Sequence, residues 1–522
     1  MGSKAHLWAA TKLGRPVKWI EDRMEYFRAS THGRESVHDM CIAVDENGII
    51  QAIVNDYVTD IGAWNSPFRS AQLSSVVFTG PYKVRDAQVR RSVALSNKTP
   101  IGAYRGYGQP EVNFAREVLL DRLARKLDMS PLDLRRRNLL TPGDLPWKTP
   151  SGAVYDNGDY LKTLQMAAEA VDYERHWSTA REPRSDGRIV GVGLSSFVER
   201  TGYASARFLA HRGSQFGAHE SVTLRANRSG GIDLYTGVST FGQGTETAFA
   251  QLCAQIVGVN YEAVRVHAGD TASSPLNTGA FASRTLIAGA GAIKQAGEAF
   301  RSKVLKIAAM ALQTAPDDLE IGGDKVHFAG DPGRYIEIKD VFIRAITGQG
   351  IPPELDPGLE TTAHFEPPEA SFSFGTAAAV VAVDPSTGEF AIERFVLVHD
   401  CGVAVNPMIV DGQVRGALVQ GLGAALGEEL RYDSETGQLI NGSMMDYFAP
   451  MAADIPPIEL LHTSVPSDVT TLGVRGVGEV GTIPPAAAIA NAICDALCDY
   501  SVELSQLPLT PERVWRALKA SQ

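Results

Sequence analysis

The sequence lacks the features that mark several large classes of protein. No apolar run approaches the roughly 18 residues that a membrane-spanning helix needs. The five cysteines are scattered and include no C-x-x-C pair, so the chain offers neither a zinc knuckle nor an iron–sulfur ligand set. The N-terminus does not have the shape of a signal peptide, and the cysteine usage fits a reducing compartment. We therefore predict a cytoplasmic protein without a membrane span.

Positive charge is also scarce. The formal net charge of −11 leaves no basic face for phosphates, which argues against nucleic acid as a partner. The chain instead has an ordinary globular composition, 44% hydrophobic and 21% charged, and its 522 residues suffice for about three domains. Its 50 glycines and 28 prolines follow no short period, which indicates many tight turns rather than a fibre.

Hydrophobic patterning predicts a mixture of helices and strands. The alternation over residues 39–56 predicts a hairpin, and the apolar run at 16–20 predicts a strand. Residues 189–197 have the composition of a buried strand, whereas 112–127 and 289–306 have helical spacing.

One glycine-rich loop near the C-terminus carries a single carboxylate. Residues 473–481 contain four glycines and Glu479, and prolines then open an apolar helix. A carboxylate in a closed, poorly hydrated loop has a raised pKa, which suits a general base working near neutrality. Residues 476–481 also match G-x-G-x-x-G, but no hydrophobic strand precedes them, so a dinucleotide site is disfavoured. A structural turn with a solvated glutamate is the other interpretation, and the loop alone does not decide.

Four further loops are rich in glycine, amides and hydroxyl groups. They span residues 102–111, 242–251, 279–285 and 400–423. The first contains Arg105, either a fixed cation for an oxyanion or an arginine stacked on a surface tyrosine. Together the loops predict a large polar cofactor that is contacted mostly by backbone and neutral side chains. None of them offers the ligand cluster of a directly bound metal, so a metal would arrive with the cofactor.

These segments, in this order, resemble the large, molybdopterin-binding subunit of the xanthine oxidase/aldehyde oxidase family of molybdenum hydroxylases. The resemblance is closest to the aerobic carbon monoxide dehydrogenase large-subunit-like (form II type) branch. It implies an α+β fold with two elongated molybdenum-cofactor-binding domains of mixed sheets and helices, lacking the family's N-terminal third with its α/β hammerhead domain. We expect residues 1–180 to be the remainder of the first molybdopterin-binding domain and 181–522 to be the second.

The resemblance also implies roles for individual residues. Glu479 matches the general base beside the metal, and Tyr107 falls where some members place an aromatic ring against the substrate. Contacts to the cofactor are implied at Arg105, Gln243, Gly244, Ala282, Ser283, Thr285, Gln413 and Gly478. The cofactor is a molybdenum–molybdopterin, with the cytosine dinucleotide form expected, and its pterin dithiolene holds the metal without a direct protein ligand.

The implied activity is hydroxylation of an aldehyde or of an N-heterocyclic carbon with oxygen taken from water. The resemblance further implies that Glu479 would act as the base that accepts the proton of the hydroxyl group, that the cofactor would supply the redox chemistry, and that Fe–S and FAD partner subunits would take up the electrons. A separate chain supplying the missing N-terminal part is another expected partner, in a dimer of heteromers. The alternative is a truncated, cofactor-free fragment or a non-catalytic assembly component.

Two departures from the family pattern bear on the substrate. Gly106 stands where carbon monoxide oxidisers have a copper-ligating cysteine, which disfavours carbon monoxide. Ala5 follows Lys4 where purine oxidisers have a glutamate, which disfavours xanthine.

Overall fold

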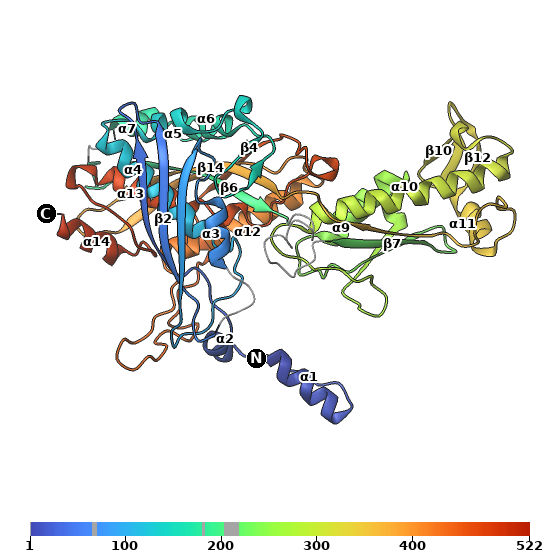
Figure 1. Ribbon diagram of the computed structural model, residues 1–522, viewed down its shortest axis with the longest axis horizontal. Coiled ribbons are helices and arrows are strands. Elements are labelled where there is room, and N and C mark those ends of the chain that lie inside the picture. The colour runs from blue at the N-terminus through green and yellow to red at the C-terminus, as the bar shows by residue number, and fades with distance from the viewer. Residues whose placement is uncertain (1, 65–69, 180–182, 203–218, 522) are drawn as a thin grey trace.

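The computed structural model describes residues 2–64, 70–179, 183–202 and 219–521, and these form two lobes (Figure 1). Helix α1 (Gly2–Leu13) projects away from the larger lobe at the N-terminal end (Figure 1). The helices of the larger lobe are α2 (Arg23–Ala29), α3 (Ser70–Val77), α4 (Gln109–Lys126), α5 (Pro131–Asn138), α6 (Tyr160–Ala170), α7 (Tyr173–Thr179), α12 (Pro407–Leu426), α13 (Pro485–Ala496) and α14 (Pro511–Ala520). Its strands are β1 (Ser36–Val44), β2 (Ile50–Asp60), β3 (Asp86–Ala94), β4 (Trp147–Lys148), β5 (Val154–Tyr155), β6 (Ile189–Thr201), β14 (Ser371–Val383), β15 (Phe390–Asp400) and β16 (Ile458–Thr463).

The smaller lobe is formed by the middle of the chain. Its strands are β7 (Glu220–Ala226), β8 (Ile232–Thr236), β9 (Val264–Ala268), β10 (Leu319–Gly322), β11 (Lys325–Phe328), β12 (Asp331–Glu337) and β13 (Glu360–Phe365). Its helices are α9 (Thr245–Val257), α10 (Thr285–Leu312) and α11 (Ile338–Thr347). The sheet β13-β7-β8-β9 packs on α9 and α10 around one apolar core, and β10-β11-β12 form a separate small sheet.

A four-stranded sheet of order β16-β15-β14-β6 lies at the centre of the larger lobe. Every residue of β6 and β14 is buried, because separate apolar cores cover the two faces of the sheet. One face packs on the alanine-rich helix α13: a Cβ added at Gly193 would lie 2.3 Å from both Ala488 O and Ala492 N. The side chains of β6 and α13 are therefore small where helix and sheet approach most closely, and this contact fixes the loop that precedes α13.

The other face of the sheet packs on α6. Helix α4 is hydrogen-bonded to the backbone of the edge strand β6 and is held by a buried network of charges. Arg135 Nη1 lies 2.6 Å from Asp121 Oδ1, and Arg116 Nε lies 3.1 Å from Glu117 Oε1. Glu117 Oε2 also accepts a hydrogen bond from the Ser196 backbone on β6 at 3.0 Å. Buried charges are tolerated where they are paired and hydrogen-bonded in this way. The network fixes the start of α4 and thus the loop at residues 102–108.

Most of the predicted elements are confirmed. Residues 39–56 form the β1–β2 hairpin, 189–197 lie in β6, and the predicted helices lie in α4 and α10. The strand predicted at residues 16–20 is wrong: this segment has no regular structure and no neighbouring strand to pair with among the described residues. The predicted domain division between residues 180 and 181 lies outside the described residues. In the part of the chain that the structure covers, no helix has the length and apolar character to cross a membrane.

Candidate active site

The loop that carries Glu479 is anchored by a buried ion pair and packed against the loop that contains Ser283. Arg475 is buried, and its Nη1 lies 3.0 Å from Asp156 Oδ1. One residue later, a Cβ added at Gly476 would lie 2.3 Å from the carbonyl oxygen of Ser283. Glycine is thus required at this position, because any other side chain would collide with backbone that cannot move aside easily. The anchored arginine and the close loop contact together fix where Glu479 lies.

Arg105 connects three segments that are far apart in the sequence. Its Nε donates to Gly478 O at 2.5 Å, and its Nη2 donates to Gln413 O at 2.9 Å and to Gln413 Oε1 at 3.2 Å. Its Nη1 donates to Gln420 Oε1 at 3.2 Å. All of these acceptors are neutral, so the guanidinium charge is not cancelled by a hydrogen-bonded carboxylate. Arg105 braces the Glu479 loop against α12 and keeps a positive charge in the site.

The carboxyl group of Glu479 has an environment suited to proton transfer near neutral pH. Burial raises its pKa to about 6, although the Gly106 backbone N–H and the charges of Arg105 and Arg34 favour the ionised form. A group with this pKa is mostly ionised at pH 7 and can accept a proton without a large energetic penalty. Sequence reasoning predicted a raised pKa for this carboxylate, and the structure gives the physical cause.

A second carboxyl group, Glu199, lies in the same site and was missed by sequence reasoning. It is fully buried near the end of β6 and accepts a hydrogen bond from Ser283 Oγ. Burial and the nearby Glu479 raise its pKa well above the ordinary value, while Ser283 and Arg105 oppose the rise. The only signal in the sequence was a charged residue at the end of an apolar strand, and the strand pattern gives no hint of what it faces.

The loop at residues 279–285 adopts unusual backbone geometry where it meets the site. Ala282 and Ser283 have φ values of 49° and 51°, a left-handed conformation that side chains other than glycine rarely adopt. The loop is held in place by the Gly202 N–H, which donates to Ala282 O at 2.9 Å. Helix α10 begins at Thr285, directly after Arg284. The first N–H groups of this helix are therefore close to Ser283 and the Glu479 loop.

Gln243 and Gly244 lie at the start of α9 in the smaller lobe. The Gln243 side chain accepts a hydrogen bond from the Phe241 N–H at 2.7 Å. Gly244 packs on α12, since a Cβ there would lie 2.8 Å from Ile409 Cδ1. Among the described residues, no hydrogen bond joins Gln243 to the Glu479 loop. The structure places the start of α9 against α12 but does not bring the Gln243 side chain onto the other predicted site residues.

Tyr107 lies in the Arg105 loop, with a φ of 45°. Its N–H donates to Tyr104 O at 2.8 Å, which closes a tight turn. Within this turn, Gly106 has a φ of 95°, and a Cβ there would lie 2.6 Å from Pro110 Cγ and 2.8 Å from Thr482 Oγ1. The turn thus holds Tyr107 beside the Glu479 loop and leaves no room for a larger residue at position 106.

The donors of the site fit a large, polar, anionic group. They are the guanidinium of Arg105, the side-chain amides of Gln413 and Gln420 on α12, and backbone N–H groups. Beside them, Glu479 can exchange a proton, and Glu199 Oε2 is buried without a hydrogen-bond partner. No group of three or more His, Cys, Asp or Glu that could hold a metal ion occurs within the described ranges. A metal that brings its own ligands fits this site better than a bare ion does.

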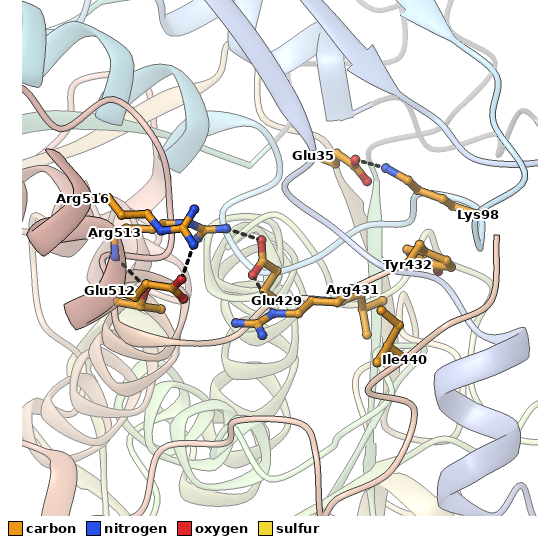
Figure 2. A pocket seen from close by; sticks show the side chains of 11 residues that line it. Glu35, Lys98, Glu429, Arg431, Tyr432, Ile440, Glu512, Arg513 and Arg516 are labelled. Atoms are coloured by element: carbon orange, nitrogen blue, oxygen red, sulfur yellow. Dashed lines mark hydrogen bonds and ion pairs between the residues drawn. The ribbon is translucent and has the colours of Figure 1, made fainter. Parts of the chain in front are cut away.

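A separate surface pocket of about 540 Å³ contains none of these residues (Figure 2). Its charged groups neutralise one another: Arg513 lies 2.7 Å from Glu429, and Arg516 lies 2.7 Å from Glu512. Lys98, on another wall of the pocket, is also paired with a carboxylate. This pocket is a groove lined by ion pairs that are exposed or half-buried, and each of its named cations already has a carboxylate partner.

Comparison with known proteins gives two matching family models and several relatives. The models are both described as molybdopterin cofactor-binding domains, and they match residues 3–139 and 166–456. The chain is 35% identical to the nicotine 6-hydroxylase large subunit of Paenarthrobacter nicotinovorans, over 99% of this chain and 65% of that protein. It is 33% identical to the carbon monoxide dehydrogenase large chain of Hydrogenophaga pseudoflava, over 98% of this chain and 64% of that protein. The chain thus spans just under two thirds of the length of these relatives.

Solved structures have the same fold. Quinoline 2-oxidoreductase from Pseudomonas putida 86 superimposes with a TM-score of 0.92 at 37% identity, over 98% of this chain and 65% of that chain. A Cu,Mo-CO dehydrogenase superimposes with a TM-score of 0.90 at 29% identity, over 99% of this chain and 66% of that chain. These matches confirm the predicted α+β class with two molybdenum-cofactor-binding domains.

Proposed function

The chain belongs to the molybdopterin cofactor-binding family, as its resemblance to xanthine oxidase-type large subunits predicted, and we propose that it forms the active site of a molybdenum hydroxylase. The proposed reaction oxidises an N-heterocyclic carbon or an aldehyde with oxygen derived from water. The single observation that carries the proposal is Glu479, a carboxylate with a pKa of about 6 in a loop braced by the cation Arg105.

Within this proposal, the residues of the chain bind, orient and move a proton. A bound molybdenum–pterin cofactor would supply the two-electron redox chemistry. Glu479 would accept the proton of the water-derived hydroxyl group as that group attacks carbon, and its pKa near 6 would let it release the proton again at neutral pH. Burial of the site would exclude bulk water and strengthen the field of Arg105 on the reacting groups.

The cofactor would be held by backbone and neutral side chains. Arg105 and the amide of Gln413 supply the strongest donors, and their mutual hydrogen bond supports a shared role. The other proposed contacts are Gln243, Gly244, Ala282, Ser283, Thr285 and Gly478. We further propose the cytosine dinucleotide form of the cofactor, and the division of the chain into domains at residues 1–180 and 181–522.

An N-heterocycle is the substrate class that the site favours. Tyr107 would place an aromatic ring against a flat substrate. Relatives of this chain bear the names nicotine 6-hydroxylase and quinoline 2-oxidoreductase. Carbon monoxide is disfavoured although one relative is a carbon monoxide dehydrogenase large chain, because Gly106 supplies no thiol and the turn has no room for one. An aldehyde is the second candidate, since the proton transfer required of Glu479 is the same.

We propose that the chain works in a complex with partner subunits. Several relatives are named as a large subunit, a large chain or a subunit of a complex. Fe–S and FAD subunits would carry the electrons away, and the assembly would be a dimer of heteromers. A cytoplasmic location is part of the same proposal.

The test is turnover by the assembled complex in isotopically labelled water. Quinoline, nicotine and benzaldehyde would be offered with an artificial electron acceptor, and the label should appear in the hydroxylated product. The Glu479→Gln variant should retain the cofactor and lose turnover. Full cofactor loading without oxidation of any of these substrates would contradict the proposal and favour the non-catalytic alternative.

A further inference from the structure

Glu199 lies under the Glu479 loop at a position that the proposed reaction does not use. It is on β6, opposite Ser373 of β14 in the central sheet, and it is fully buried. Ser373 Oγ donates a hydrogen bond to the carbonyl oxygen of Gly476, in the loop that carries Glu479. The sheet that holds Glu199 is thus bonded directly to that loop.

Ser283 makes a second connection between Glu199 and the loop. Its hydroxyl group donates to Glu199 Oε1, while its backbone lies against Gly476, where an added Cβ would come within 2.3 Å of Ser283 O. The same Ser283 hydroxyl would lie 3.1 Å from a Cβ at Gly478. Glu199 Oε2, by contrast, is buried without a hydrogen-bond partner. One carboxyl oxygen is therefore occupied, and the other is available to carry a proton.

The charges around Glu199 cannot compensate two carboxylates. The groups that act on it are Glu479 from the glycine loop, Arg105 from the loop before α4, and the hydroxyl group of Ser283. Arg105 is the single cation among them, and its hydrogen bonds run to neutral oxygens. Arg34 also acts on Glu479, but its Nη1 lies 3.7 Å from a further carboxylate, Glu111. A buried ionised carboxylate without a paired cation is costly, and two carboxylates in one site do not both ionise at neutral pH. One of the pair therefore keeps its proton.

We propose that Glu199 is the carboxyl group of the pair that keeps its proton, which it holds on Oε2 at neutral pH. Glu199 is then a positioning residue that acts through Ser283, and Glu479 is the ionised partner. Glu199 is the more deeply buried of the two groups and is therefore the one that stays neutral. Glu479 accepts a hydrogen bond from the Gly106 backbone N–H, and both Arg105 and Arg34 favour its ionised form. The protonation of Glu199 is a property of this chain alone. Its effect on the rate rests on the proposed function.

The experiment counts the protons released when the protein unfolds. Wild type and Glu199→Gln would be unfolded by denaturant at pH 7 in weak buffer. Because unfolding exposes a neutral Glu199 to water, where it ionises, wild type should release about one more proton per chain than the variant. Glu354→Gln, which replaces an exposed carboxylate, is the matched control and should release the same number as wild type. Equal release by wild type and Glu199→Gln would overturn the inference.

Two further measurements keep the inference testable if Glu199→Gln does not fold. The infrared spectrum of wild type at pH 7 should contain the carbonyl band of a protonated carboxyl group. The same band should lie at a different frequency in Ser283→Ala, because that change removes the hydrogen bond to Glu199 Oε1. An unshifted spectrum would overturn the inference. In the folded Glu199→Gln enzyme, the acidic limb of kcat/KM should keep its midpoint near pH 6, since a neutral amide replaces a neutral acid. A downward shift of that midpoint would show that Glu199 had been ionised.

These outcomes separate the inference from the proposed function. The extra proton together with an inactive, cofactor-loaded complex would support Glu199 as an acid and refute the hydroxylase. Normal turnover without the extra proton would support the hydroxylase and refute the inference about Glu199.

Discussion

Replacing Glu479 by glutamine removes the group that we propose as the base, and the structure sets the size of the effect. Burial raises the pKa of Glu479 from 4.5 to about 6. This rise means that the folded protein disfavours the ionised carboxylate by ~2 kcal/mol, at about 1.4 kcal/mol per pH unit. A carboxyl group whose pKa is raised in the folded state favours folding most below its unfolded pKa, and that contribution is lost as pH rises to about 6. Glu479→Gln should thus be more stable than wild type above pH 6, and this advantage should disappear below pH 4.5.

The activity of Glu479→Gln, unlike its stability, should be lower than that of wild type. In wild type, kcat/KM should fall about tenfold per pH unit below pH 6, because only the ionised form of Glu479 accepts a proton. In Glu479→Gln, kcat/KM at pH 7 should fall by about 10²–10⁴-fold and the acidic limb should disappear. The assay is kcat/KM from pH 4.5 to 8 at matched molybdenum content, with Glu354→Gln as the control for an exposed carboxylate. A variant that keeps the acidic limb near pH 6 would refute the reasoning.

Two further predictions concern how the loop is held. Gly476→Ala should lower the thermal midpoint and the cofactor content, because its Cβ would lie 2.3 Å from Ser283 O. The control is Gly412→Ala, whose Cβ would meet no atom of another segment within 4 Å. It should leave both quantities unchanged or slightly raise stability. Equal effects of the two changes would contradict the close contact. Arg475→Met leaves the buried carboxylate of Asp156 without its cation and should cost about 3–5 kcal/mol in denaturant unfolding. A decrease of less than about 1 kcal/mol in the free energy of unfolding would show that the Arg475–Asp156 pair is not essential.

The sequence revealed the loops of the site because their chemistry is local. Four glycines around Glu479 indicate close backbone approach wherever the loop lies in the fold. The same reasoning singled out Arg105 but left two interpretations open, a fixed cation for an oxyanion and an arginine stacked on a surface tyrosine. It could not identify Gln420 as a partner of Arg105, because the two residues are 315 positions apart and meet only when α12 packs beside the loop.

Buried partners across a sheet were beyond sequence reasoning. Glu199 lies in a strand whose pattern shows that it is buried but not which loop covers it. Its position depends on the register of β6 with β14 and on the contact of Ser283 with Gly476. The strand wrongly predicted at residues 16–20 has a related cause, since an apolar run becomes a strand only where a neighbour offers hydrogen bonds.

The most direct test of the central claim is the molybdenum and pterin content of the chain. The protein would be purified with its partner subunits from cells that make the cofactor, as wild type, Arg105→Ala and the exposed control Arg516→Ala. We expect near-stoichiometric molybdenum and pterin in wild type and in the control, and a several-fold loss in Arg105→Ala, because that change removes the donors to Gly478, Gln413 and Gln420. Wild type without either component, or Arg105→Ala with full content of both, would contradict the account of this site.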